Sequence, residues 1–150
     1  MSYLLDANAL FALVWPLHRY HATIQHWMMT GLGDHRWATT QLTQLAVLRL
    51  LLNPQVTQGV FSSTSAHSVL TGLQSHPKHE LWPPAENAVD QVAPLVSKIR
   101  GHNQWNDAVL LRQAVDRQGV LVTFDSGIEA LARGAWEQHL LLLRPLATPP

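Results

Sequence analysis

Two short apolar runs in this chain each end in an aspartate, and this repeated pattern constrains the fold more than any other feature. The first run, residues 4–5, ends at Asp6, and the second, residues 120–124, ends at Asp125. Continuous apolar runs are typical of strands in a parallel sheet, which is covered on both faces. Ligands of open α/β sheets bind beyond the carboxyl ends of the strands. We therefore expect both aspartates to share one site at that edge.

Asp6 also has a simpler explanation. A helix is predicted to start near Ala7, and aspartate is a favoured residue at the N-cap of a helix. On its own, Asp6 fits a cap as well as a functional site. The second aspartate at a strand end favours the functional interpretation.

Helices are predicted between the strands. Apolar periodicity indicates helices from Ala7 to about Val14, from about Tyr20 to Thr30, from a cap at Thr39 or Thr40 to a stop at Asn53-Pro54, and from about residue 104 to Gly119. Shorter helices are predicted through residues 69–73, from about residue 85 and through 128–131. Further strands are predicted at 36–39 and 140–143, with a short one near 79–82. Residues 55–65 are predicted to be a connection and 148–150 a loose tail.

This alternation predicts a three-layer α/β/α sandwich with a largely parallel central sheet. The chain has 150 residues, of which 47% are hydrophobic. That is enough for one domain with a substantial core and leaves little room for a second. We therefore expect a single domain over residues 1–150.

The charge balance and the absence of cysteine limit the kinds of function that this chain can have. Ten Lys and Arg balance ten Asp and Glu, so a nucleic-acid substrate would need a local basic patch. No cysteine is present, which excludes disulfides and thiolate metal sites. The sequence shows no secretory signal pattern and no apolar run approaching the ~18 residues of a spanning helix. We expect a cytoplasmic protein that does not bind membranes.

A third acid stands at a helix start. The stretch from Gly101 to Asn106 leads into a predicted helix whose first turn carries Asp107. The helix macrodipole alone would explain an acid there. However, this helix leads directly into the strand that ends at Asp125.

Three aspartates at one edge would repel one another unless a cation neutralises them. An all-oxygen site suits Mg²⁺ or Mn²⁺, which can activate a water and stabilise charge on a phosphodiester. Asn8 and Thr123 are placed to hold that water or a carboxylate.

The histidines offer a competing metal interpretation. His18 and His21 are three residues apart, as are His76 and His79. Neither pair has a second pair of ligands at a suitable spacing. We therefore expect all four histidines to have structural roles and not to bind a metal.

Four motifs, in this order, resemble the PIN-domain ribonucleases and most closely the VapC-like toxins of bacterial toxin–antitoxin pairs. The motifs are LLDANAL, TQLAVLRLLLNP, GHNQWNDAVLL and LVTFDSGIEAL. The resemblance implies that Asp6, Asp107 and Asp125 are the catalytic, metal-binding acids, supported by Asn8, Gln44 and Thr123. Gln44 departs from the family pattern, which commonly has a glutamate there. An amide offers an oxygen but no charge, so a weaker metal affinity is expected.

The resemblance implies a Mg²⁺- or Mn²⁺-dependent endoribonuclease that cleaves RNA, either tRNA or another structured or single-stranded RNA, by metal-activated water. It also implies a homodimer and a cognate antitoxin. Large apolar residues between Ala9 and Met29 are predicted to form the antitoxin surface, and the antitoxin is predicted to place an arginine near the acids. The alternative is that these apolar residues pack against each other or form the homodimer contact.

Two alternatives remain. One is a catalytically weak or silent PIN-like RNA- or protein-binding domain, favoured by Gln44 and by the absence of net positive charge. The other is a phosphoryl-transfer domain with an aspartate nucleophile. That class usually has a second acid near the first strand and a lysine late in the chain. Here Asn8 follows Asp6, and the only lysines are Lys78 and Lys98.

Overall fold

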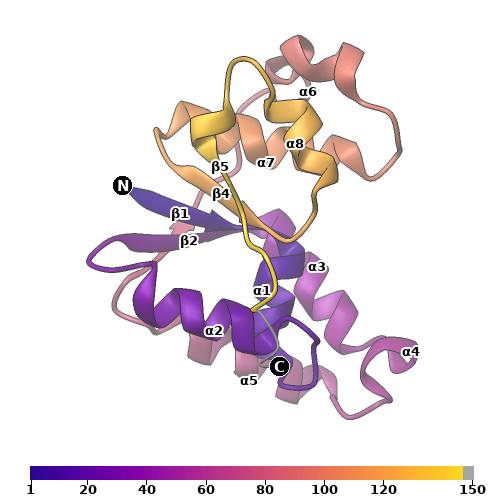
Figure 1. The fold of residues 1–150 in the computed structure, drawn as a ribbon. Coiled ribbons are helices and arrows are strands. Elements are labelled where there is room, and N and C mark those ends of the chain that lie inside the picture. Colours follow the sequence, from indigo (N-terminus) through magenta and orange to yellow (C-terminus); the bar gives the residue numbers. More distant parts are fainter. Residues whose placement is uncertain (147–150) are drawn as a thin grey trace.

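Five parallel strands form the centre of the molecule (Figure 1). The computed structural model describes residues 1–146, so the tail predicted at 148–150 lies outside the described residues. The sheet has the order β3-β2-β1-β4-β5, and every neighbouring pair is parallel. The strands are β1 (Ser2–Leu5), β2 (Arg36–Thr40), β3 (His79–Trp82), β4 (Val120–Thr123) and β5 (Leu140–Leu142). The predicted parallel sheet is confirmed.

Helices cover both faces of this sheet, which confirms the predicted three layers. One face carries α1 (Ala7–Val14), α2 (His21–Thr30), α3 (Gln41–Leu51) and α5 (Ser63–Gln74). The other carries α6 (Ala88–Gln91), the 3-10 helix η1 (Ala93–Lys98), α7 (Gln104–Asp116) and α8 (Gly127–Ala132). Leu4 and Leu5 are both fully buried, one in each of the two cores. Successive residues of a strand point to opposite faces, so two consecutive apolar residues in β1 are what two covered faces require.

Two local predictions need correction. The stretch predicted as a connection contains a short helix, α4 (Pro54–Thr57). Asn53 caps it and Pro54 occupies its first turn, where a missing N–H does no harm. The helix predicted from about residue 85 starts only at Ala88 and becomes the 3-10 helix η1, because Pro94 cannot donate an α-helical hydrogen bond. A second 3-10 turn, η2 (Glu137–His139), precedes β5.

The predicted apolar surface on the N-terminal helices is smaller than expected. Phe11 and Trp27 are buried, and Tyr20 and Met28 are partly buried. Leu17 and Met29 are the large apolar residues of this group that stay mostly exposed, each at 76%. The difference arises because aromatic side chains of these helices pack against the sheet: the ring of Trp27, for example, lies edge to face with that of Tyr3 on β1, with centroids 5.2 Å apart.

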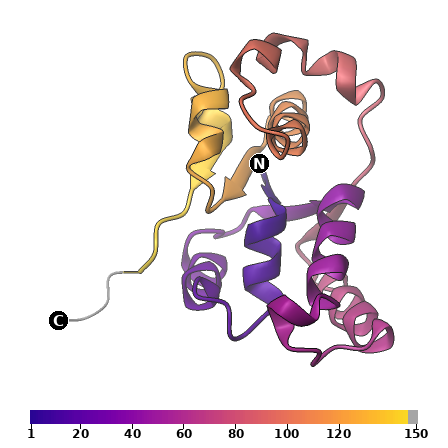
Figure 2. The same cartoon turned by 90° about the vertical axis from the view of Figure 1, so that its right-hand side faces the viewer.

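The strand order creates a crevice at the carboxyl end of the sheet. The chain proceeds from β1 to β2 and β3 on one side, and β4 and β5 lie on the other. The order reverses between β1 and β4, and ligands of open α/β sheets bind at such a point. Figure 2 faces this end and shows α1 and α3 below the sheet edge and α7 end-on above it.

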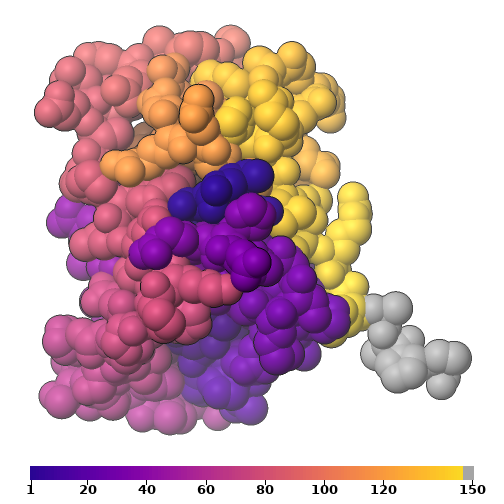
Figure 3. Space-filling view, turned by 90° about the vertical axis from the view of Figure 1, so that its left-hand side faces the viewer, coloured from indigo at the N-terminus to yellow at the C-terminus, as the bar shows by residue number. Residues whose placement is uncertain are grey.

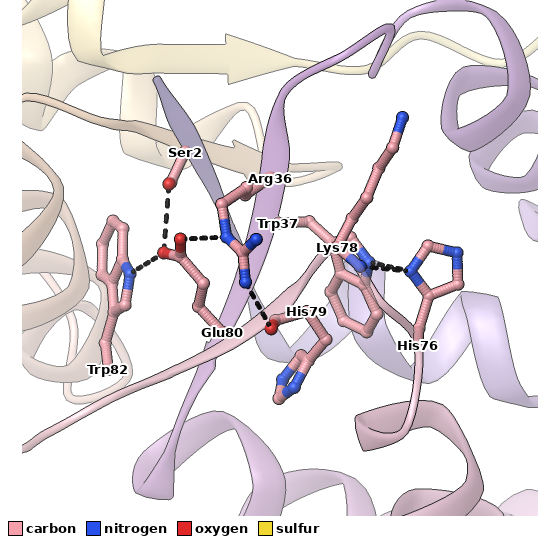
Figure 4. A network of polar contacts seen from close by, with 8 residues as sticks. All are labelled: Ser2, Arg36, Trp37, His76, Lys78, His79, Glu80 and Trp82. Carbon is pink, nitrogen blue, oxygen red and sulfur yellow. Dashed lines mark hydrogen bonds and ion pairs between the residues drawn. The ribbon is translucent and has the colours of Figure 1, made fainter.

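At the opposite end of the sheet, the first residues of the chain lie at the surface (Figure 3). A polar network fixes the strands there (Figure 4). Arg36 forms an ion pair with Glu80, and the Ser2 hydroxyl and Trp82 Nε1 each donate to the Glu80 carboxylate at 3.1 Å. This network connects β1, β2 and β3. None of the helices in residues 1–146 combines the length and apolar character that crossing a membrane requires.

Candidate active site

Asp6 follows β1 directly and is the N-cap of α1. Its Oδ1 accepts a hydrogen bond from the backbone N–H of Ala7 (2.7 Å). Its Oδ2 accepts from the Thr123 hydroxyl (2.7 Å) and from Asn8 Nδ2 (3.2 Å). Burial raises the pKa of this carboxyl, the bonds from Thr123 and Ala7 oppose that rise, and the charge of Asp125 adds to it. The cap interpretation is correct but incomplete, because the same carboxylate also binds β4.

One hydroxyl and one amide connect Asp6 to Asp125. Thr123 Oγ1 donates to Asp6 and accepts from the backbone N–H of Asp125 (3.0 Å). Asn8 Nδ2 donates to the same hydroxyl oxygen (3.1 Å), while Asn8 Oδ1 accepts from the backbone N–H of Phe124 (3.1 Å). Asp125 itself is exposed, and its Oδ1 accepts from the backbone N–H two residues later (2.8 Å). The structure thus brings these two acids together with two of the predicted supporting residues, Asn8 and Thr123.

Asp107 completes the acidic group from the other helical layer. It lies in the first turn of α7 and is half-buried. Burial raises the pKa of its carboxyl to about 7, with further contributions from the charges of Asp6 and Asp125. Within residues 1–146, no hydrogen-bond donor is paired with this carboxylate. Of the three acids, Asp107 is therefore the one whose carboxylate charge is stabilised by the fewest hydrogen bonds from the protein.

A single pocket of about 490 Å³ contains all three acids. Asn8 lines it, Thr43 and its neighbours on α3 form one wall, and Asn103 and Asn106 at the start of α7 form another. His18, from the connection between α1 and α2, also reaches it. The sequence analysis did not predict Asn103, Asn106 or His18 as site residues. Two asparagines three positions apart at a helix start share a face and were a usable signal, whereas nothing local marks His18.

Gln44 does not line this pocket, in contrast to the sequence-based expectation. Its amide Nε2 donates instead to Thr39 Oγ1 on β2 (2.8 Å). A capping box between Thr40 and Thr43 fixes the phase of α3, so that Thr43 faces the acids. The next residue is rotated by about 100° around the helix axis. Through Thr43, the first turn of α3 therefore lines the pocket that contains Asp6, and Gln44 faces away from it.

The chemistry of the acidic pocket suits a divalent cation. Carboxylate and amide oxygens are ligands that Mg²⁺ and Mn²⁺ accept, and a cation would relieve the repulsion that raises the pKa of Asp107. Among residues 1–146, no three acidic or histidine side chains are close enough to ligate one ion jointly. Mg²⁺ commonly keeps several waters and uses one or two carboxylates. The acids thus fit an ion held partly through water, and direct ligation by all three stays a prediction.

The second histidine pair, His76 and His79, has structural partners (Figure 4). His76 Nδ1 accepts from Trp37 Nε1 (3.3 Å) and from the backbone N–H of Lys78 (3.1 Å). His79 Nε2 is hydrogen-bonded to Thr39 Oγ1 (2.9 Å). Both rings also lie against Trp37, with centroids 5.9 and 4.6 Å from it. These contacts explain the pair without a metal.

The first pair shapes the connection between α1 and α2. His21 Nδ1 is hydrogen-bonded to the Ala12 carbonyl oxygen (2.7 Å), which joins the two helices. His18 Nδ1 accepts from the backbone N–H of Tyr20 (3.0 Å). Both Nδ1 atoms are therefore hydrogen-bonded to the backbone, so this pair also has structural partners and needs no metal.

Comparison with known proteins agrees with the fold. A family model described as the PIN domain matches residues 3–134. The chain belongs to the PIN domain family. Curated relatives of this PIN domain include Ribonuclease VapC38 and Ribonuclease VapC29 of Mycobacterium tuberculosis. They are 38% and 36% identical, and each alignment covers 87% of this chain and 89% or 91% of the relative.

Solved structures show the same fold at low sequence identity. This PIN domain resembles Mycobacterium tuberculosis VapC20, described as a toxin that cleaves the sarcin-ricin loop, with a TM-score of 0.65 and 12% identity over 85% of this chain and 93% of that one. It also resembles a chain of VapBC2 from Rickettsia felis, solved bound to a promoter DNA fragment, with a TM-score of 0.67 and 13% identity over 96% and 100% of the two chains. These likenesses support the fold alone.

Proposed function

We propose that this PIN domain is a divalent-metal-dependent endoribonuclease that acts as the toxin of a toxin–antitoxin pair. The observation that carries the proposal is the convergence of Asp6, Asp107 and Asp125 from three separate segments on one pocket at the carboxyl edge of the sheet. The relatives named as VapC ribonucleases support RNA as the substrate. The VapBC chains among the structural neighbours support a protein antitoxin.

Each acid has a separate task in this proposal. Asp6 accepts from Thr123 and Asn8 at Oδ2 and from the backbone N–H of Ala7 at Oδ1, and it serves as the fixed anchor of the site. Asp107 and Asp125 are more exposed and, together with Asp6, would hold Mg²⁺ or Mn²⁺ directly or through water. When bound, such an ion lowers the pKa of a water and stabilises negative charge on the phosphodiester oxygens.

Proton transfer is assigned to Asp107. Its carboxyl lines the pocket and has no hydrogen-bond donor paired with it among residues 1–146, so its oxygens can accept hydrogen bonds from a water. In the proposed reaction, Asp107 accepts a hydrogen bond from the attacking water and takes its proton as the water oxygen bonds to phosphorus. The bond from phosphorus to the leaving oxygen breaks, and that oxygen takes a proton from solvent water. Asn103 and Asn106, on the same wall, offer amide donors to the phosphate oxygens.

Replacement of the acids tests this function. Purified protein should cleave RNA with Mg²⁺ or Mn²⁺ and lose the activity in EDTA. Asp107→Asn and Asp125→Asn should each reduce cleavage by at least about a hundredfold, in line with the removal of a group that stabilises the transition state, while circular dichroism stays unchanged. Asp34→Asn, an exposed acid on a loop, is the control. Cleavage that persists in EDTA, or full activity of both variants, would exclude the mechanism.

The toxin role and its partner are tested in cells. Expression of the chain alone should arrest growth, and co-expression with the small protein encoded beside it should restore growth and yield a complex. We propose that this antitoxin covers Leu17 and Met29 and places an arginine near the acids, and that the PIN domain itself forms a homodimer. Equal growth in both cases, with no complex recovered, would remove the support for a toxin.

A weak or silent binding domain is the second candidate. Gln44 favours it, because the position that commonly carries an acid in the family here carries an amide bonded to Thr39. RNA binding without cleavage at any Mn²⁺ concentration would support this candidate over the nuclease.

A further inference from the structure

A second cavity opens directly beside the acidic pocket. It has a volume of about 330 Å³ and shares Asn8, His18 and Asp125 with the acidic pocket. Its remaining walls are Arg19 and Tyr20, from the connection between α1 and α2, and Phe124, which follows β4. A chain that crosses the acidic pocket can therefore continue into this cavity.

An arginine lies over an aromatic pair at this cavity. The Tyr20 ring stacks on Phe124 with centroids 4.5 Å apart and an angle of 18° between the planes. The Arg19 guanidinium carbon lies over the same Tyr20 ring, 4.5 Å from its centroid. A stacked guanidinium keeps its N–H edge available and loses little freedom when it binds an anion. Within residues 1–146, exposed Arg19 forms no ion pair.

His18 adds a neutral donor between the two pockets. Its Nδ1 accepts from the Tyr20 backbone N–H, so Nδ1 carries no proton and the proton of the neutral ring is on Nε2. The ring packs edge-on against Phe11, with centroids 5.5 Å apart. Burial lowers the pKa of His18, with smaller contributions from Arg19 and His21, which keeps the ring neutral. Nε2 has no partner among residues 1–146 and is not buried.

We infer that this cavity, the Arg19 pocket, binds the nucleotide next to the scissile phosphodiester of a single-stranded RNA, with Arg19 on its phosphate and His18 Nε2 donating to an oxygen of the same backbone. The assignment rests on the proposed nuclease function and names how its substrate is held. It also answers an electrostatic difficulty. The chain has no net positive charge, and three acids repel RNA, so a fixed cation beside them is what a polyanionic substrate needs.

The test compares two exposed arginines that each lie over an aromatic ring. Arg117 also lies over an aromatic ring, 5.1 Å from the centroid of Trp82, but it lines a different cavity that contains none of the three acids. Arg19→Gln and Arg117→Gln remove the same charge. Binding of a fluorescein-labelled pool of short single-stranded RNAs of mixed sequence is measured by anisotropy at several salt concentrations, in the Asp107→Asn background with Mn²⁺. Cleavage of the same pool by otherwise unaltered protein gives KM and kcat.

Arg19→Gln should weaken RNA binding about five- to tenfold and reduce the slope of log K against log salt by about 0.7, the value for one phosphate contact on a single strand. KM should rise by a similar factor, with kcat within about twofold of the parent. Arg19→Lys should retain the salt slope, because the charge remains, and recover part of the affinity. Arg117→Gln should match the parent in every measurement. Thermal melts of all variants show whether they are folded.

The assignment is overturned if Arg19→Gln behaves like Arg117→Gln while the parent protein binds and cleaves RNA. It is also overturned if Arg19→Gln leaves RNA binding intact but weakens binding of the antitoxin, since the cavity would then belong to the protein partner. A parent protein that neither binds nor cleaves the RNA pool contradicts the proposed nuclease function itself. The parent protein alone reveals that result, so a failure of the proposed function can be distinguished from a failure of the Arg19 assignment.

Discussion

Replacement of Asp107 by asparagine should stabilise the metal-free protein at neutral and alkaline pH, although it removes a proposed catalytic group. The pKa of this carboxyl rises from its ordinary value of 3.8 to about 7 on folding, through burial and through the charges of Asp6 and Asp125. The folded state thus binds the proton more tightly than the unfolded state. Stability from this group is complete below about pH 4 and is lost as the pH rises to about 7. Asparagine carries no charge and avoids this loss.

The size of the effect follows from the pKa change. About 1.36 kcal/mol per pKa unit would give about 4 kcal/mol for the full difference. Asp107 is only half-buried, and solvent screens such interactions strongly, so we expect about 1–2 kcal/mol at pH 8. For a domain of this size, that corresponds to a rise in Tm of about 3–6 °C. Below about pH 4, where both states bind the proton, the gain should vanish.

The assay is thermal unfolding in EDTA at a series of pH values for the parent, Asp107→Asn and the exposed control Asp34→Asn. The gain in Tm should grow with pH for Asp107→Asn alone. Mn²⁺ should raise the Tm of the parent more than that of this variant, because ligand binding to the folded state stabilises it. A variant that melts with the parent at pH 8, or below it, would refute the claim that burial and the charges of Asp6 and Asp125 disfavour the ionised Asp107 carboxylate.

Three further predictions concern the supports of the site and of the core. Thr123→Val should lower stability by about 1–3 kcal/mol and reduce cleavage, since it leaves Asp6 without its hydroxyl donor; Thr123→Ser should restore both, and an unchanged denaturant midpoint for the valine variant would contradict this. Gln44→Glu should leave Mn²⁺ affinity unchanged in calorimetric titrations, because its side chain lies outside the pocket; tighter binding would show that it reaches the ion. Gly119→Ala should lower the stability of the protein by about 1–3 kcal/mol, since the new Cβ would lie 2.7 Å from a backbone oxygen of β1. Gly72→Ala, whose Cβ would have nothing within 4 Å, should raise the stability by up to about 1 kcal/mol. Equal Tm values for both variants would refute the packing argument.

Some features of the site are readable from local sequence. Asp6 and Asp125 could be placed at strand ends because each follows an apolar run that only a doubly covered strand accommodates. Asp107 could be placed at a helix start from its loop and periodicity. Gln44 was misplaced because a helix turns about 100° per residue, so an error of one position in phase moves a side chain to another face. The contact that sets this phase is the capping box at Thr40, and a list of apolar positions does not contain it.

The sequence by itself determined the alternation of strands and helices, the parallel sheet and the position of each acid relative to its own element. All of these depend on residues within one or two turns of each other, where propensity and apolar period act. Only the tertiary structure decided that Thr123 lies against Asp6 although 117 positions separate them, that Asp107 has a pKa of about 7, and that Arg19 stands beside the acids. Burial and charge interactions act through space, so they depend on distances that exist only after the two helical layers have packed on the sheet.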